Sequence, residues 1–450
     1  MSDTWPQGPD EMPQSTSAPE FAAFASIDWA ARKHVWKMAR RDAPSEQGEF
    51  ENTPEAVQAW ATGLFHRFGG RPIAVCLEQS RGALVYMLTR YPHLVLFPVH
   101  PTTAARYRET FCPSGAKGDP GDTASLLDLL LRHRERLRPL QLDTAPTRLL
   151  QLLTQQRREL VDEKTRQKLR LIASLKQYFP QLLQWFDDVD SPLVGALLQR
   201  WPSLQQLQRT NPSQLRDFFH EHNCRGEERI QQRIQAIYAA TPATEDAVVL
   251  EGEGSKACDW VAVVATLRER IAKLDQRNAE LVATHPDSVL FASLPGAGPV
   301  LLPRLLVAFG TRRDRYDSAY QMQCLSGIAP VTESSGNRQC VQFRFHCPKF
   351  LRQTFHEFAF CSLQKSVWAQ AYYKLQRDKK KSHQAAVRAL AYKWIRIIYR
   401  CWKDGKLYDE QTHLENLQKR NSPLRGGIAS ATGKRWNPVG GLRKISENFS

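Results

Sequence analysis

The sequence predicts an N-terminal α/β domain, a helical middle region and a mainly α-helical C-terminal region. Short apolar strands alternate with helical segments over residues 21–137, an almost continuous helical pattern covers 138–286, and long amphipathic helices recur over 287–412. Residues 1–20 and 413–450 are rich in small, polar and Pro residues, so we expect flexible tails there.

The first domain is predicted from the order of its strands and helices. Strands are expected at 24–30, 34–40, 48–52, 72–78 and 94–99. Helices are expected from Thr53 onward and at 84–90, 103–110 and 123–134. The short first connections favour antiparallel strands, and the helical crossovers that follow favour parallel ones. This order is that of the RNase H-like (RuvC-like) fold.

The middle region carries a heptad pattern near its end, with Asn278 as the one polar residue among apolar positions 264, 267, 271, 274 and 281. Such a pattern is typical of a coiled coil, in which a single Asn fixes register and partner number. An intramolecular helical hairpin explains the pattern equally well. An additional segment near 186–255 is expected to be helical, with an acidic loop at 245–253.

In the C-terminal region, a Gly-rich turn at 294–298 precedes a helix predicted at 300–309. Such a turn can direct backbone N–H groups at a phosphate, or can simply join two packed helices. Two further helices are expected, at 350–375 and 381–402.

Composition limits the class of function. The 62 Lys and Arg exceed the 46 Asp and Glu and give a formal charge of +16, which favours nucleic acid as a partner. No apolar run is long enough for a membrane span, and no signal peptide is predicted. Nine Cys without a CxxC pair indicate reduced thiols and a bacterial cytoplasmic setting. We expect the protein to be nucleoid-associated when it acts.

Four carboxylates are candidate metal ligands. Asp28 lies in the first strand, Glu78 ends the fourth, and Asp119 and Asp122 lie near the start of a helix. In the predicted topology the first and fourth strands are neighbours, so Asp28 and Glu78 converge. Clustered acids repel one another unless cations intervene, and hard oxygen ligands suit Mg²⁺ or Mn²⁺, two of which catalyse phosphoryl transfer. Alone, Asp119 and Asp122 would also fit a solvated helix cap.

Three further patterns concern nucleic acid. The turn at 332–338 carries Ser335 beside Gly336 and Arg338, which fits either a polar turn or an exposed nucleophile that metal ions or Arg activate. Residues 374–406 hold eleven Lys and Arg against two Asp, which favours phosphate binding by Lys379, Lys380, Lys381 and Arg388 over a merely solvated face. A second basic stretch on the long helix includes Arg157 and Arg158. The interleaved aromatic residues fit a core better than stacking platforms.

Together these motifs resemble the DEDD transposases of the IS110 family of insertion sequences. The resemblance covers about 24–180 and 255–410. It is carried by Ser26-Ile-Asp28, Cys76-Leu-Glu78, Lys117-Gly-Asp119-Pro-Gly-Asp122, Leu294-Pro-Gly-Ala-Gly298, Leu325-Ser-Gly-Ile-Ala-Pro330 and Glu333-Ser-Ser-Gly336. Ser26 departs from the usual Gly, and Gln79 and Gly118 also differ from the pattern.

The resemblance implies specific roles. Asp28, Glu78, Asp119 and Asp122 would be the DEDD ligands of a RuvC-like domain. Ser335, rather than Ser334, would attack DNA to give a phosphoserine intermediate. A noncoding bridge RNA would specify donor and target DNA, and dimers would form a tetrameric synapse with shared active sites.

Other classes of function fit part of the pattern. A RuvC-like nuclease, such as a junction resolvase, would need the four acids but not Ser335. A non-catalytic nucleic-acid-binding scaffold would need neither, and the intact acids and Ser-Gly pair argue against it. An actin-type ATPase is disfavoured because the turn after Asp28 lacks a phosphate-loop Gly.

Overall fold

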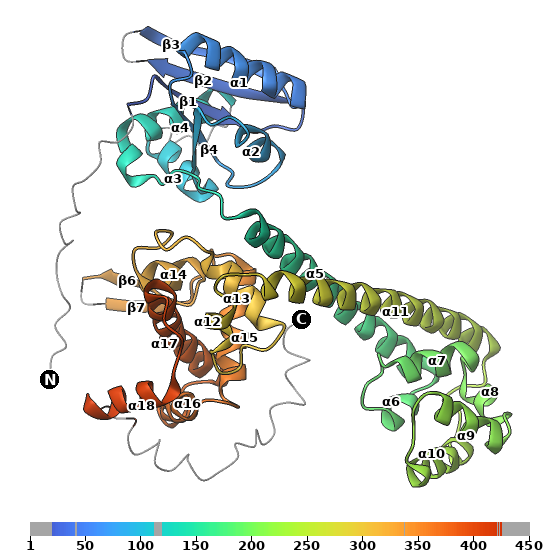
Figure 1. The fold of residues 1–450 in the computed structure, drawn as a ribbon. Helices are drawn as coiled ribbons and strands as arrows, with labels where there is room; N and C mark the ends of the chain where they lie inside the picture. The colour runs from blue at the N-terminus through green and yellow to red at the C-terminus, as the bar shows by residue number, and fades with distance from the viewer. Residues whose placement is uncertain are drawn as a thin grey trace. The chain divides into compact units, whose positions relative to one another are not determined.

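A computed structural model describes residues 20–40, 43–111, 119–336, 338–420, 422 and 424, without the side chains of 119, 120, 338 and 339. Most of both predicted tails therefore lies outside the described residues. The chain divides into two compact units, one ending at Leu142 and the other beginning at Asp143 (Figure 1).

The first unit is built on a five-stranded sheet of order β3-β2-β1-β4-β5. The strands are β1 (Ala23–Asp28), β2 (Lys33–Arg40), β3 (Ala43–Glu51), β4 (Ile73–Leu77) and β5 (Leu94–Pro98). Strands β1, β2 and β3 pair antiparallel, whereas β4 runs parallel to both β1 and β5. These directions confirm the prediction. Strand β3 begins five residues earlier than expected.

Helices cover both faces of this sheet. They are α1 (Pro54–Phe68), α2 (Ala83–Leu88), α3 (Pro101–Phe111) and α4 (Asp119–His133), followed by a 3-10 turn, η1 (Arg134–Arg136). One core joins α1 and α2 to one face through Ile27, Val57 and Leu84. The other core joins α3 and α4 to the opposite face through Cys76, Ala104 and Leu130. The mixed α/β prediction for this region is therefore confirmed.

The second unit begins with a long helical hairpin. Helix α5 (Ala145–Tyr178) packs along α11 (Ala247–Ala283), and between them lie α6 (Leu182–Trp185), α7 (Pro192–Arg200), α8 (Leu204–Gln208), α9 (Pro212–Glu221) and α10 (Glu227–Ala239). The short helices share a core with the hairpin ends, with Phe218, Phe219 and Leu175 fully buried. Helix α11 already includes residues 247–253, so the predicted acidic loop there is wrong.

The heptad pattern packs within the chain. Val264, Leu267 and Asn278 are buried on α11, which lies against α5. This is the intramolecular hairpin that the sequence left open beside a coiled coil between chains.

The rest of the second unit contains α12 (Ser288–Ala292), α13 (Leu301–Phe309), α14 (Ala319–Leu325), the hairpin β6 (Val331–Ser335) and β7 (Arg338–Gln342), α15 (Lys349–Ser362), α16 (Val367–Asp378), α17 (His383–Asp404) and α18 (Glu410–Lys419). The helix expected at 350–375 is two helices, because the chain turns after Ser362 and the Ser366 hydroxyl caps α16. Helix α18 extends past residue 412, so the predicted flexible tail begins too early.

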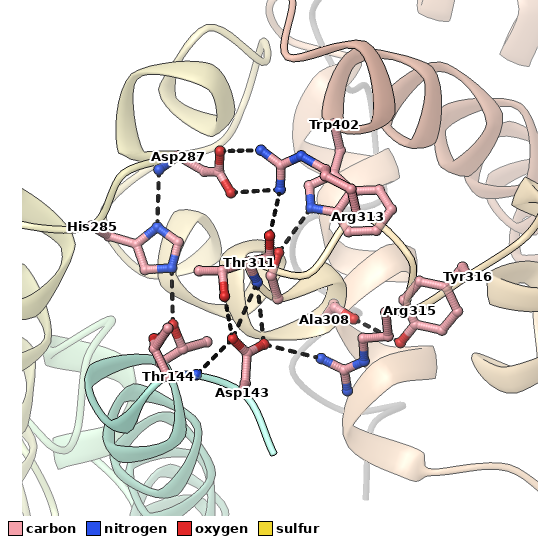
Figure 2. A network of polar contacts seen from close by, with 12 residues as sticks. Asp143, Thr144, His285, Asp287, Ala308, Thr311, Arg313, Arg315, Tyr316 and Trp402 are labelled. Atoms are coloured by element: carbon pink, nitrogen blue, oxygen red, sulfur yellow. Dashed lines mark hydrogen bonds and ion pairs between the residues drawn. The ribbon is translucent and has the colours of Figure 1, made fainter. Parts of the chain in front are cut away.

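A polar network holds the start of α5 against the C-terminal helices (Figure 2). The carboxylate of Asp143 accepts hydrogen bonds from the backbone N–H and hydroxyl of Thr311. His285 contacts Thr147 through Nε2, at 3.2 Å, while Asp287 pairs with Arg313. Residues more than a hundred positions apart in the sequence are thereby joined.

None of the helices in the described part of the chain combines the length and the apolar character that a bilayer span requires.

Candidate active site and nucleic-acid surface

Asp28 and Glu78 come together at one edge of the sheet. Asp28 is the last residue of β1, and Glu78 directly follows β4. The two strands are parallel, and Ile27 pairs with Leu77, so the two acids occupy neighbouring positions at the carboxyl ends. Both side chains are partly exposed. This edge is the usual functional edge of parallel strands.

The remaining two acids lie on helix α4, which packs against β1. Asp119 is its first residue and Asp122 lies in its first turn, so the two positions share a helix face. The Ser26 hydroxyl of β1 donates a buried hydrogen bond of 2.7 Å to the Thr123 carbonyl oxygen. This bond fixes the first turn of α4 against the strand that carries Asp28. The side chain of Asp119 lies outside the described residues.

An arginine side chain neutralises part of this acidic edge of the sheet. Arg108 of α3 pairs with Asp122, and both side chains are largely buried, with exposed fractions of 15% and 19%. The hydrogen bond and charge of Asp122, together with the charge of Glu78, raise the pKa of Arg108. Arg108 therefore lies within electrostatic reach of two of the four acids.

The chemistry of these side chains fits hard divalent cations. Asp28, Glu78 and Asp122 offer carboxylate oxygens, the ligands that Mg²⁺ and Mn²⁺ prefer. Burial and the charge of Glu78 raise the pKa of Cys76 to about 12, so its thiol is protonated and is no competing thiolate ligand. Among the described side chains, no three His, Cys, Asp or Glu are close enough to form a complete metal site.

The predicted serine lies in the second unit, at the tip of a β-hairpin. Ser335 is exposed, ends β6 and pairs in register with Arg338 of β7. Gly336 follows with a φ of 55°, the left-handed conformation that tight hairpin turns favour. Ser334 is also exposed, but adjacent strand residues face opposite sides of a hairpin. The side chain of Arg338 lies outside the described residues.

The Gly-rich turn before α13 joins two packed helices. Gly296 has a φ of 90°, and a Cβ there would lie 2.9 Å from the backbone of Cys361 and Ser362. The N–H groups of Ala297 and Gly298 donate to carbonyl oxygens within the turn. These N–H groups are therefore occupied, which favours the packing interpretation over phosphate binding.

The predicted basic residues fall into two environments. Lys379, Lys380 and Lys381 are exposed in the turn between α16 and α17. In contrast, Arg157 pairs with Asp275 across the helical hairpin, and Arg158 pairs with Asp162 and Glu357. The lysine turn is thus open to an anionic partner, whereas the two arginines have partners within the chain. The aromatic residues Trp394 and Trp402 are fully buried, as predicted.

Sequence reasoning missed Ser26 and Arg108 as neighbours of the acids. No local pattern marks either residue, because Ser26 bonds to a carbonyl oxygen 97 positions away and the partner of Arg108 lies fourteen positions away on another helix.

Two family profiles match this chain. Residues 25–180 match a profile described as a transposase, the DEDD transposase of IS110, and residues 288–374 match the transposase family of IS116, IS110 and IS902.

Full-length relatives agree with these matches. The chain is similar to a protein of Streptomyces coelicolor named "Mini-circle putative transposase for IS117", with 28% identity over 86% of this chain and 95% of that protein. It is also similar to the uncharacterized 43.6 kDa protein of insertion element IS110 from the same organism, with 26% identity over 81% of this chain and 89% of the other. The 42 kDa protein of insertion element IS900 from Mycobacterium paratuberculosis is 24% identical over 78% of this chain and 84% of its own length.

Proposed function

This chain belongs to the IS110 family of transposases of insertion elements, and from that premise we propose that it cuts and rejoins donor and target DNA with two groups of residues. The first group is the acidic edge of the N-terminal unit, and the second is the serine hairpin of the other unit. The main support is that Asp28 and Glu78 meet at adjoining strand ends, beside the helix that contains Asp122.

The N-terminal unit is assigned an RNase H-like, RuvC-like fold. Three antiparallel strands followed by two parallel ones, with helices on both faces, support this assignment. Asp28, Glu78, Asp119 and Asp122 would hold two Mg²⁺ or Mn²⁺ ions. Bound ions supply Lewis-acid stabilisation of the charge on the reacting phosphate. Asp122 would share its carboxylate between Arg108 and a bound ion.

Ser335 is assigned the role of nucleophile. Its Oγ forms a bond to phosphorus while the bond from phosphorus to one deoxyribose oxygen breaks, which leaves a phosphoserine and a free DNA hydroxyl. Attack by a DNA hydroxyl on the phosphoserine reverses the step and joins the strands. Exposure of Ser335 at a hairpin tip supports this role, because a DNA phosphate can reach it.

The initial binding of DNA would depend on attraction between lysine side chains and DNA phosphates. The exposed lysines 379–381 offer three cations on a turn with φ of 59° at Lys380, and such contacts give sequence-independent affinity. Arg157 and Arg158, which are paired within the chain, contribute less. The family resemblance supports a noncoding bridge RNA as the source of sequence specificity, and a dimer that forms a tetrameric synapse.

Covalent trapping tests this function. The protein is incubated with Mg²⁺, donor and target duplexes, and RNA transcribed from the flanks of its element, and a denaturing gel and mass spectrometry then detect DNA on a serine peptide. We expect an adduct on Ser335 that is lost in Ser335→Ala and in Asp28→Asn, while both variants still bind DNA. Ser334→Ala is the matched control and should keep the adduct.

A metal-dependent nuclease that does not use the serine is the second candidate, supported by the acidic edge alone. It predicts DNA cleavage without an adduct, insensitive to Ser335→Ala but abolished in Asp28→Asn. That result would retire the serine mechanism and keep the metal site.

A further inference from the structure

A pair of arginines shares one aromatic ring at the base of the serine hairpin. Phe343 directly follows β7, and two guanidinium groups lie over its ring, that of Arg352 from α15 at 4.9 Å and that of Arg388 from α17 at 4.2 Å. Three elements that are distant in sequence thus converge on this ring. We call Phe343, Arg352 and Arg388 the arginine clamp.

Within the described part of the chain, the two charges of the clamp have no acidic partner. No carboxylate among the described residues forms an ion pair with Arg352 or Arg388, although other arginines of the same unit, such as Arg400 with Asp404, are paired. Burial lowers the pKa of Arg388, and the positive charge of Arg352 lowers it further. Two like charges that are partly withdrawn from water are costly unless an anion joins them.

Hydrogen bonds connect the clamp to the segments on either side of the serine hairpin. The Arg352 guanidinium contacts the Arg344 carbonyl oxygen at 3.5 Å, and Arg344 itself donates to the Ala329 carbonyl oxygen at 3.3 Å, just before β6. Phe343 stands five positions after Arg338, the residue that pairs with Ser335. At a strand rise of about 3.3 Å per residue, this separates clamp and serine by roughly 17 Å, about five base-pair steps of duplex.

Exposed aromatic side chains flank the clamp. The Phe345 ring lies 5.1 Å from that of Phe343 and is 72% exposed, and Tyr320 is 57% exposed. A hydrogen bond with Cys324 raises the pKa of Tyr320 and the positive charge of Arg344 opposes this shift, so Tyr320 lies near Arg344 at the hairpin base. Exposed rings beside unpaired cations are the combination with which proteins bind nucleic-acid strands, because bases stack on rings while cations meet phosphates.

We infer that the arginine clamp binds a phosphodiester of the DNA strand that Ser335 attacks, with Phe345 stacking on a nearby base. The inference rests on the proposed function for the identity of the strand. The clamp sets the distance between a held phosphate and the attacked one, and thereby positions the strand on the hairpin. The guanidinium fork suits phosphate because it offers two parallel N–H donors.

The salt dependence of DNA binding tests the clamp. Binding of a labelled duplex by the full chain is measured by fluorescence anisotropy over a range of salt concentrations for the double variant Arg352→Gln and Arg388→Gln. We expect the slope of log affinity against log salt to fall by about one per lost contact, and affinity to fall about tenfold or more at low salt. Arg400→Gln and Lys365→Gln together remove the same charge and should leave the slope unchanged.

Two further variants separate binding from folding. The double variant Arg352→Lys and Arg388→Lys keeps both charges and should keep the slope, and circular dichroism checks that each variant is folded. A folded glutamine variant with the wild-type slope on DNA would overturn the inference. A loss seen with labelled RNA but not with DNA would overturn the assignment to the DNA strand.

The outcome is independent of the serine chemistry. Ser335→Ala removes the adduct but not the clamp, so it should bind DNA with the wild-type slope. If trapping finds no serine adduct while the clamp variants lose slope, the proposed mechanism fails and the DNA-binding clamp stands.

Discussion

Ser26 shows how one buried hydroxyl positions an acid that it does not touch. It is fully buried in β1, two residues before Asp28, and its hydrogen bond to the Thr123 carbonyl oxygen joins two elements 97 positions apart. Asp122 is the residue before Thr123. Ser26 therefore links the strand that carries Asp28 to the helix turn that carries Asp122.

Replacing this hydroxyl should loosen the acidic edge. We expect Ser26→Ala to lower the free energy of unfolding of the N-terminal unit by about 1–2 kcal/mol and to raise the Mg²⁺ concentration needed for half-maximal cleavage. Thermal unfolding and Mn²⁺ binding by calorimetry measure the two effects. Ser125→Ala is the control, because among the described residues that hydroxyl bonds only to the Gly121 carbonyl oxygen within its own helix. Unchanged Mn²⁺ affinity in Ser26→Ala would show that the bond is merely structural.

At the scale of single residues, the sequence predicts those contacts that follow from the order of the strands. Asp28 and Glu78 meet as expected because their strands are parallel neighbours. Ion pairs between side chains of different helices cannot be predicted in the same way. Arg157 meets Asp275 across 118 positions only because α5 and α11 pack in one particular register, and no local pattern encodes that register.

Among the elements, the turn before α13 depends on Gly296. Its φ of 90° is strained for any residue with a side chain, and a Cβ would collide with the rigid backbone of α15 at Cys361 and Ser362. We expect Gly296→Ala to destabilise the second unit by about 2–4 kcal/mol, through strain and overpacking. Urea unfolding measures this.

Gly298 provides the matched control in the same turn, because a Cβ there meets no atom within 4 Å. Gly298→Ala should change the free energy of unfolding by less than about 1 kcal/mol. Equal effects of the two substitutions would contradict the packing interpretation of the turn.

Helix periodicity predicts the long helices of the second unit but not their ends. The segment 350–375 has one continuous apolar pattern, yet it breaks because Ser366 caps α16 and because Glu410 accepts bonds from Ser366 and Val367. That acid arrives from α18, so the break has a tertiary cause. Asn278 is similar: its position in the heptad is clear from sequence, but its burial within the chain follows from packing.

At the scale of the whole molecule, histidines in both units make the free energy of unfolding depend on pH. Burial lowers the pKa of five histidines in the described part of the chain, and that of His356 falls to about 4; the five are His34, His285, His356, His383 and His413. Each is neutral in the folded state at neutral pH. When the pH falls below about 6.5, the unfolded chain takes up protons that the folded chain does not, so stability is lost.

We therefore expect stability to decrease steadily from pH 6.5 toward pH 4 and to be insensitive to these groups above pH 7.5. Between pH 7.5 and 5.5, His356 alone should lower the free energy of unfolding by about 1.4 kcal/mol. The reason is that the pKa of this histidine in the unfolded chain lies about one unit above pH 5.5, so only the unfolded chain is protonated there. Thermal unfolding of wild type and His356→Gln across this range measures the contribution, with exposed His66→Gln as the control. The His356→Gln curve should be flatter than that of wild type by this amount, and parallel curves would contradict the neutral, buried state of His356.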